Sequence, residues 1–369
     1  MSKISVMKRA VSSVIFLLGI VQFASAQHYV RTDLTTDSAG VSPTAAHVDP
    51  NLVNAWGLAR GSASPWWVAD NGTGLSTLYD ATGTPQSLIV KIPAPSGNKS
   101  SAPTGTVFNS TTGFELAPGK PAIFLFVTED GTILGWNPGV SPTTAVIKVN
   151  RSGKAVYKGC AIVMTTFGPR LYATNFQTRR VEVFDSTFNQ IPTNESAFNN
   201  EGVGNRNGLQ LTPFNIQNIG GSLVVTFAFK HPGSTDEEHG AGFGDVAVFD
   251  PLGRRVLRLQ HGNWLNAPWG VALAPSDFGV FGHRLLIGNF GSGTIEAYNA
   301  ITGLHEGTLL DATGKNIMID GLWALSFGGD ATRNGLAISL YFTAGPNDEN
   351  DGLFGTISAV STESRGNSE

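Results

Sequence analysis

Residues 268–299 read PWGVALAPSDFGVFGHRLLIGNFGSGTIEAYN, and this stretch decides the fold. It holds three short apolar segments, at 268–274, 284–289 and 294–299, with glycine-containing turns between them. The third segment alternates apolar and polar residues, as a half-buried strand does. It ends in Tyr298 and Asn299, and an Asn can open a turn in which a following glycine supplies positive φ. The stretch therefore predicts three antiparallel strands, with a fourth strand at 305–310.

The same order of segments recurs along the whole chain. First strands are expected at 55–59, 113–117, 160–165, 211–219, 268–274 and 321–326. Second strands are expected at 65–70, 122–129, 170–175, 222–227, 284–289 and 339–344. Third strands are expected at 75–80, 132–137, 180–185, 245–250, 294–299 and 355–360. Since a repeat of about 50 residues is typical of propeller blades, the chain is predicted to be an all-β, six-bladed β-propeller.

The two ends of the repeat region complement each other. The sixth set of strands ends at residue 360 without a fourth strand, whereas segment 29–34 (YVRTDL) precedes the first set without a partner. Pairing this N-terminal strand into the last blade would close the ring and remove exposed edges. The alternative is a pair of β-sandwiches, but six matched triplets are hard to reconcile with two unrelated sandwiches.

The N-terminus has the pattern of a cleaved secretory signal. Lys3, Lys8 and Arg9 precede an apolar stretch at 10–23, and small residues at 24–26 suit cleavage before Gln27. An uncleaved anchor would want about 20 continuous apolar residues, and this stretch is shorter. The predicted organisation is a signal peptide at 1–26, one propeller domain at 27–360 and a flexible polar tail at 361–369. Secretion to the extracellular space or the periplasm is expected, with no membrane span after cleavage.

The net charge argues against nucleic acid as a partner, and the cysteine content excludes an internal disulfide. Loss of residues 1–26 would take the net charge from −4 to −7, and an acidic surface argues against nucleic acid as a partner. Cys160 is the single cysteine, so the chain cannot form an internal disulfide. Because it lies in an apolar run, we expect a buried, inert thiol.

Three segments resemble a family of secreted bacterial proteins. They are NAWGLA (54–59), PWWVADNGTGLSTLYDATG (65–83) and YFTAGPNDENDGLFGTI (341–357). The family is uncharacterised and propeller-like, and some of its members carry a C-terminal PEP-CTERM sorting tail. This chain ends in SRGNSE without such a tail, so free secretion is expected. The repeats also look loosely like NHL-type propellers, which are mostly binding scaffolds, but neither resemblance implies an activity.

The loops that enter first strands and leave second strands should open on one face of a propeller. They are rich in carboxylate and amide side chains: Asn54, Asp70, Asn71, Glu129, Asp130, Asn175, Asn266, Asn289 and Asp320. Such oxygens can hold Ca²⁺ or bind a polar ligand such as a sugar, so these residues are candidates for a ligand site at the channel mouth. The alternative role for each is to start a turn.

Two longer insertions are expected on the same face. Segment 230–244 carries His231, Asp236, Glu237, Glu238 and His239, and segment 345–352 carries Asn347, Glu349, Asp351 and Gly352. The first set could ligate a divalent metal, although its spacing fits no zinc motif. The second resembles the start of a calcium loop, but Ser358 stands where the twelfth-position Glu belongs. A solvated acidic loop is the alternative for the first set.

The sequence favours a binding function over catalysis. It contains no GxSxG, HExxH or GxxxxGK[ST] motif. A non-enzymatic scaffold for a protein or glycan ligand is predicted. The alternative is a metal-assisted hydrolase or lyase, which requires three or more of Asp70, Glu129, Asp130 and Asp320, or the acids of segment 230–244, to converge. Trp56, Trp269 and Trp323 could stack on carbohydrate, but packing between blades is the expected role. The sequence leaves the oligomeric state open.

Overall fold

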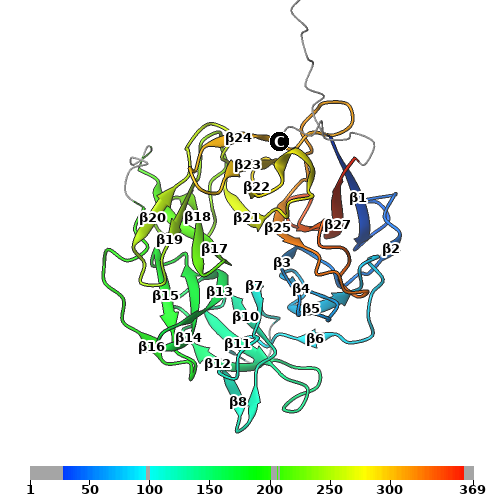
Figure 1. The fold of residues 1–369 in the computed structure, drawn as a ribbon. Coiled ribbons are helices and arrows are strands. Elements are labelled where there is room, and N and C mark those ends of the chain that lie inside the picture. The colour runs from blue at the N-terminus through cyan, green and yellow to red at the C-terminus, as the bar shows by residue number, and fades with distance from the viewer. Residues whose placement is uncertain (1–27, 97–99, 201–205, 207, 361–369) are drawn as a thin grey trace, which may run out of the picture.

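A computed structural model describes residues 28–96, 100–200, 206 and 208–360. Over these residues, six sheets are arranged around a central axis, which confirms the six-bladed all-β propeller (Figure 1). The predicted signal peptide and the polar tail lie outside the described residues. We number the blades in the order of their inner strands.

Blades one to five are four-stranded antiparallel sheets whose strands run outward in chain order. Blade one contains β3 (Ala55–Ala59), β4 (Trp66–Asp70), β5 (Leu75–Tyr79) and β6 (Val90–Lys91). Blade two contains β7 (Pro103–Phe108), β10 (Phe124–Thr128), β11 (Thr132–Trp136) and β12 (Val146–Asn150). Blade three contains β13 (Tyr157–Thr165), β14 (Gly168–Asn175), β15 (Arg180–Phe184) and β16 (Gln190–Ile191).

The second half of the ring repeats this order. Blade four contains β17 (Gln210–Ile219), β18 (Ser222–Lys230), β19 (Asp245–Phe249) and β20 (Arg255–Arg258). Blade five contains β21 (Pro268–Leu273), β22 (Arg284–Asn289), β23 (Ile295–Asn299) and β24 (His305–Thr308), with a short 3-10 helix, η1 (Gly279–Phe281), between its first two strands. Blade six contains β25 (Leu322–Phe327), β26 (Leu340–Ala344), β27 (Leu353–Ala359) and β1 (Tyr29–Thr36), and β2 (His47–Val48) pairs with β1 in parallel.

The N-terminal strand closes the ring, as predicted. β1 pairs antiparallel with β27, from Tyr29 opposite Ala359 to Thr36 opposite Leu353. The Tyr29 ring lies 4.9 Å from the Phe278 ring, centroid to centroid, and its hydroxyl donates to the Phe278 carbonyl at 3.1 Å. The first strand is therefore held both by the last blade and by blade five, although it is far from both in sequence.

The predicted inner strand of blade two is wrong. Segment 113–117 contributes β8 (Glu115–Ala117), which pairs only with β9 (Lys120–Pro121) in a small hairpin. The inner strand is instead β7, which reads PTGTVF and has no aromatic residue ahead of its glycine. A Cβ on Gly105 would lie 2.8 Å from the backbone nitrogen of Cys160, so small residues are needed where this strand meets blade three.

Every inner strand is bulged at the same place. In β13, for example, Lys158 is the extra residue between the pairs Tyr157–Asn175 and Gly159–Thr174. The residues at the equivalent bulge positions are Trp56, Thr104, Lys158, Phe214, Trp269 and Trp323. A bulge re-aims a side chain, and here it turns large rings inward to pack around the axis.

The axial rings form a packed cluster. The Trp323 ring stacks on Trp56 with 3.7 Å between centroids and on Phe290 with 3.8 Å. Trp269 meets Trp323 edge-on at 5.9 Å, and all of these rings belong to one buried cluster. Since the three tryptophans are buried, they pack between blades and present no stacking face to solvent. Further buried clusters fill the spaces between neighbouring blades, and Cys160 lies inside one of them, so its predicted burial is confirmed.

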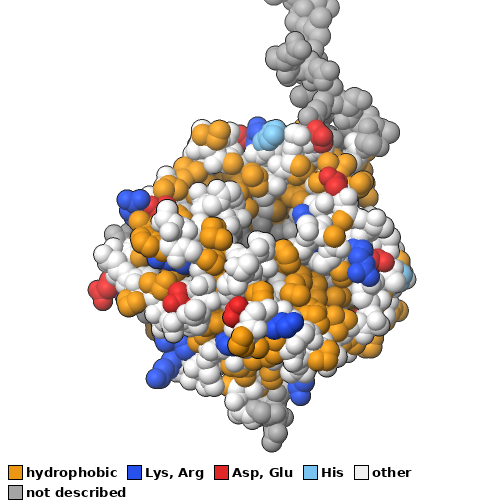
Figure 2. Space-filling view, turned by 60° about the horizontal axis from the view of Figure 1, so that its bottom comes forward, with side chains coloured by type: hydrophobic (Ala, Val, Ile, Leu, Met, Phe, Trp, Pro, Cys, Tyr) orange, Lys and Arg blue, Asp and Glu red, His pale blue; other side chains and the backbone are white. Residues whose placement is uncertain are grey.

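The surface is mixed in character. Figure 2 shows hydrophobic side chains spread over the face in view, with a hollow at the centre of the ring. Within the described ranges, none of the helices is both long and apolar enough to cross a membrane.

Candidate functional site

A buried lysine lies at the axial end of blade three. Lys158 occupies the bulge of β13, at the position where four other blades place an aromatic ring, and its side chain is only 2% exposed. Its ammonium lies 5.0 Å from the centre of the Trp56 ring and 5.4 Å from that of Phe176. Because a buried charge is costly unless it is paired, the carboxylates around this ammonium define the site.

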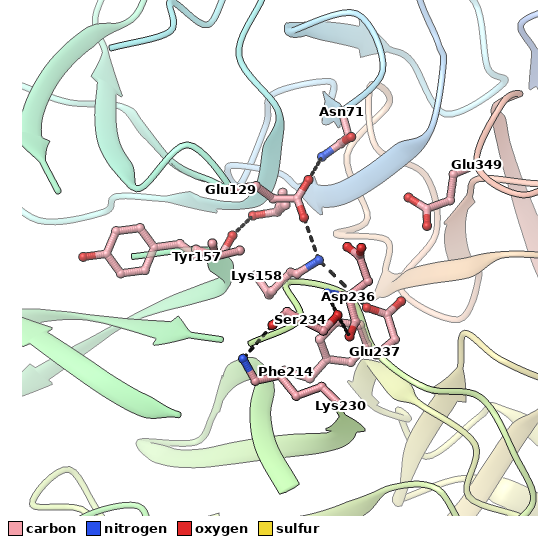
Figure 3. A network of polar contacts seen from close by, with 12 residues as sticks. Asn71, Glu129, Tyr157, Lys158, Phe214, Lys230, Ser234, Asp236, Glu237 and Glu349 are labelled. Atoms are coloured by element: carbon pink, nitrogen blue, oxygen red, sulfur yellow. Dashed lines mark hydrogen bonds and ion pairs between the residues drawn. The ribbon is translucent and has the colours of Figure 1, made fainter. Parts of the chain in front are cut away.

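Two glutamates from different blades compensate this charge. The Lys158 ammonium donates to Glu129 Oε1 at 2.6 Å and lies 3.9 Å from Glu237 Oε2 (Figure 3). Glu129 follows β10 of blade two, and its side chain is 25% exposed. Glu237 lies in the loop between β18 and β19 of blade four, and its side chain is only 5% exposed. The pair with Glu129 is thus a hydrogen-bonded ion pair, whereas Glu237 acts on Lys158 through charge alone.

Amide side chains from blade one connect this pair to blade six. Asn71 donates to Glu129 Oε2 at 3.0 Å, and Asn54 donates to Asn71 Oδ1 at 3.3 Å. Asn54 also donates to Glu349 Oε2 at 2.6 Å and accepts a hydrogen bond from the Trp323 indole at 2.8 Å. Its φ of 48° is in the left-handed region, which Asn tolerates better than most residues. The predicted shared mouth therefore exists for Asn54, Asn71 and Glu129.

The blade-four loop covers one side of this network. Gly240 donates its backbone N–H to Asn266 Oδ1 at 2.7 Å, so this candidate from blade five holds the loop in place. His239 lies edge-on to the Phe290 ring at 5.1 Å, and its Nε2 lies 3.8 Å from Glu237 Oε1. The Lys230 ammonium donates to the Ser234 carbonyl at 2.8 Å within the same loop. Side chains from all six blades thus meet around the mouth.

The charges of the network shift one another's pKa values. Burial, followed by the nearby Glu237 charge, raises the pKa of Glu349 to about 7. Burial would lower the pKa of Lys158, but the Glu129 and Glu237 carboxylates outweigh it and raise this pKa. Burial would likewise raise the pKa of Glu237, but Lys158 and His239 bring it below its ordinary value. The mouth therefore favours the charged forms of Lys158 and Glu237, whereas Glu349 takes up a proton at a higher pH than an ordinary glutamate.

Asp70 and Asp130 do not join the network. Asp70 is fully buried in blade one, where its Oδ2 accepts the Thr77 backbone N–H at 2.9 Å and its Oδ1 has no hydrogen-bond partner. Burial raises its pKa well above the ordinary value. Asp130 accepts the Ser101 hydroxyl at 2.6 Å and the Ala102 backbone N–H at 2.9 Å, so it fixes the entry into β7.

The other amide candidates serve their own blades. Asn175 donates to Glu182 Oε1 at 3.0 Å, and Asn289 donates to the Trp264 carbonyl at 2.9 Å. Asp320 is exposed and accepts the Asn347 backbone N–H at 2.9 Å, which supports the blade-six loop. A ligand role for any of the nine candidates stays a prediction.

The acidic insertions do not gather into a metal site. Glu238 Oε1 lies 3.4 Å from His231 Nε2, and Asp236 donates its backbone N–H to the Ser234 hydroxyl. Asp351 accepts the Asn347 side-chain amide at 3.0 Å. Among the residues that the structure describes, no three His, Cys, Asp or Glu side chains are grouped so that they could hold an ion. The described residues therefore do not show the cluster of converging carboxylates that a metal-assisted hydrolase or lyase requires.

Lys158 is the network residue that the sequence analysis missed. Its segment reads YKGCA, and aligning the glycine with AWGLA and PWGVA places Lys158 where Trp56 and Trp269 stand. Because the first strand of this blade was expected to begin at Cys160, Lys158 was left outside the predicted repeat. A lysine directly before the strand glycine was the available signal.

Comparison with known proteins finds viral relatives. No family model matches the chain. It is 33% identical to the uncharacterized protein R648 of Acanthamoeba polyphaga mimivirus over 321 residues, which cover 85% of this chain and 76% of that protein. It is also 33% identical to the uncharacterized protein L690 of the same virus over 322 residues, covering 85% of this chain and 82% of that protein. These relatives do not support the bacterial origin or the sorting-tail members that the resemblance implied.

Solved structures show the same fold. A streptogramin B lyase structure aligns with a TM-score of 0.50 and 11% identity, covering 90% of this chain and 98% of that one. A structural genomics protein of unknown function from Bacteroides thetaiotaomicron aligns with a TM-score of 0.54 and 8% identity, covering 91% and 76%. At such low identity these likenesses concern the fold alone.

Proposed function

This chain belongs to the family of the mimivirus proteins R648 and L690, and we propose that it is a secreted, non-enzymatic binding propeller whose ligand sits at the channel mouth. The ligand is a protein or a glycan. Secretion rests on the pattern of residues 1–26, which lie outside the described residues.

One observation carries the proposal: Lys158 is a buried charge at a position where the fold itself accepts an aromatic ring. Apolar side chains stand at the equivalent bulges of blades one, four, five and six. Replacing a buried ion pair by well-packed apolar groups is often neutral or stabilising. Since strongly perturbed titratable groups cluster at functional sites, the charged mouth is better explained by a ligand than by stability.

The surroundings suit binding on a rigid support. Glu129 and Glu349 come from loops of blades two and six, and both are partly exposed. Asn54 and Asn71 fix these carboxylates in place from blade one. Loops that are held by a rigid scaffold are where recognition usually sits.

A binding screen with a matched control tests the proposal. The full chain and its Glu129→Gln variant would be applied to a glycan array and to a panel of peptides, together with Glu195→Gln as the control. Glu195 is a suitable control because its side chain is 94% exposed and belongs to the outer part of blade three. We expect at least one probe whose binding falls about tenfold in Glu129→Gln and stays unchanged in the control. If every probe binds Glu129→Gln as tightly as it binds wild type, the proposal is contradicted.

A further inference from the structure

We propose that the channel mouth recognises a protonated amine, presented as a lysine side chain of a protein partner. This inference rests on the proposed function and names the chemistry of its ligand. It starts from a mismatch between the carboxylates and the cations around the mouth.

The mouth has more negative than positive charge. Glu129, Glu237 and Glu349 lie around the ammonium of Lys158 (Figure 3), and Asp236 and Glu238 flank Glu237 in its loop. Two other cationic side chains lie nearby: the Lys230 ammonium is 5.1 Å from the centre of the Phe176 ring, and His239 Nε2 is 3.8 Å from Glu237 Oε1. Lys230 donates to Ser234 in its own loop, and Arg179 lies on the turn after β14. A ligand that adds positive charge would therefore be favoured.

One buried carboxylate oxygen of the network has no hydrogen-bond donor. Glu237 Oε2 is buried and has no hydrogen-bond partner, although its neighbour Glu129 accepts from both Lys158 and Asn71. An unpaired buried acceptor costs free energy, and a donor that arrives with a ligand would recover it. An ammonium is a strong donor because it provides three N–H groups and a full charge.

The carboxylates that a ligand can reach are Glu129 and Glu349. Glu129 is 25% exposed, and Glu349 lies partly exposed in the loop between β26 and β27. The raised pKa of Glu349, about 7, comes from burial and from the Glu237 and Glu129 charges, which a bound ammonium would offset. An amine entering between these two side chains would add positive charge close to the Glu237 carboxylate, whose charge acts on Glu349.

A metal ion is a poorer match for the same charges. In the chain as described, no three metal-ligating side chains are grouped for coordination. Glu129 already uses one oxygen for Lys158 and the other for Asn71. Glu237 Oε2 has no hydrogen-bond partner, which suits the directional donors of an ammonium.

The experiment uses fluorescently labelled hexalysine as the probe and the same peptide with every side chain acetylated as the neutral control. Binding to the full chain is followed by fluorescence anisotropy for wild type, Glu349→Gln, Glu129→Gln and Glu195→Gln. Circular dichroism and melting curves confirm that each variant is folded. We expect saturable binding of hexalysine, about tenfold weaker in each of the two mouth variants, no change in Glu195→Gln and no binding of the acetylated peptide.

A pH series adds a readout that general surface charge would not produce. The groups that face Glu349 are Glu237, Glu129, Lys158, His239 and the Asn54 amide. As pH falls, protonation of Glu349, whose pKa is raised to about 7, and of His239, whose pKa is raised by Glu237, both make the mouth less negative. Hexalysine should therefore bind wild type several-fold more weakly at pH 6 than at pH 8, and this change should be smaller in Glu349→Gln.

The outcomes separate this inference from the proposed function. Equal binding of acetylated and unmodified peptide, or equal weakening by Glu195→Gln, would overturn the amine site. If hexalysine does not bind while a glycan binds in a Glu129-dependent manner, the amine site is wrong and the binding function stands. If no probe depends on the mouth residues, both are wrong.

Discussion

Replacing Lys158 by methionine removes the ammonium at the centre of the mouth and keeps a side chain of similar length. Methionine can fill the space between the Trp56 and Phe176 rings that the lysine stem now occupies. The packing loss is therefore small. What changes is the charge balance, because Glu129 and Glu237 lose their shared partner.

The magnitude follows from how buried each carboxylate is. Removing one partner of a buried ion pair costs about 3–5 kcal/mol, since the other charge is left uncompensated. Glu129 is 25% exposed and can be hydrated, whereas Glu237 is only 5% exposed. Since only Glu237 is sealed from water, we expect a loss at the lower end, about 3 kcal/mol of unfolding free energy at pH 7.5.

Equilibrium unfolding in urea, followed by tryptophan fluorescence, measures this loss. In wild type the pKa of Glu237 lies below its ordinary value, so its contribution to stability is present at neutral pH and is lost as pH falls. Without Lys158 the buried carboxyl keeps only His239, 3.8 Å away, as a cationic partner, so its pKa rises and the penalty grows as pH increases past the ordinary value. The variant should therefore be less destabilised at pH 5 than at pH 7.5.

A second substitution decides whether charge is the cause. Lys158→Met combined with Glu237→Gln removes both buried charges, and most of the lost stability should return. An unchanged unfolding free energy in Lys158→Met at pH 7.5 would refute the reasoning. So would an equal loss in the double variant.

Three further predictions concern the scaffold. Tyr29→Ala should lower the unfolding free energy by about 3–5 kcal/mol, because it removes the buried ring that anchors the closing strand to blade five. Val30→Ala should change it little, because the Val30 side chain is 49% exposed. Urea unfolding of both variants checks this, and equal effects would contradict the anchoring role of Tyr29. Gly57→Ala should destabilise by about 1–3 kcal/mol because its Cβ would lie 2.2 Å from a backbone oxygen of the next inner strand. Gly40→Ala is the control, because its Cβ would meet only the Ser38 hydroxyl oxygen, at an ordinary 3.9 Å, and melting temperatures compare the two variants. Asp70→Asn should stabilise the protein above pH 4. Burial raises the pKa of Asp70 in the folded protein, so the unfolding free energy of wild type falls by up to about 1.4 kcal/mol per pH unit between the unfolded and folded pKa values. Unfolding curves from pH 4 to 8 check this, and the same pH dependence in variant and wild type would contradict it.

Most of the fold followed from local patterns. Second and third strands such as β22 and β23 were located because period-two alternation and turn residues are properties of a short segment. The closing strand was located because it lacked a partner within its own stretch of chain. β7 was missed because its sequence, PTGTVF, reflects contact with blade three through Gly105, and segment 113–117 imitated the expected aromatic pattern.

The site was less predictable than the fold. Asp70 and Asn71 are neighbours in sequence, yet the end of β4 directs the first into blade one and the second to the mouth. The strand boundary decides between these two environments, and a boundary is poorly defined by composition. Lys158 was detectable in principle, because its glycine aligns with those after Trp56 and Trp269, but its importance depends on the bulge that turns it inward.

The sequence alone determined the six-fold repeat, the all-β architecture and the face on which amides and carboxylates collect, because strand periodicity and turn chemistry act between near neighbours. The tertiary structure decided which of those polar side chains meet. Lys158, Glu129, Glu237 and Glu349 come from four blades, and their distances depend on ring closure and on one bulge in each inner strand. The pairing of these charges is set by the position of whole blades around the axis, and no short segment of the chain encodes that position.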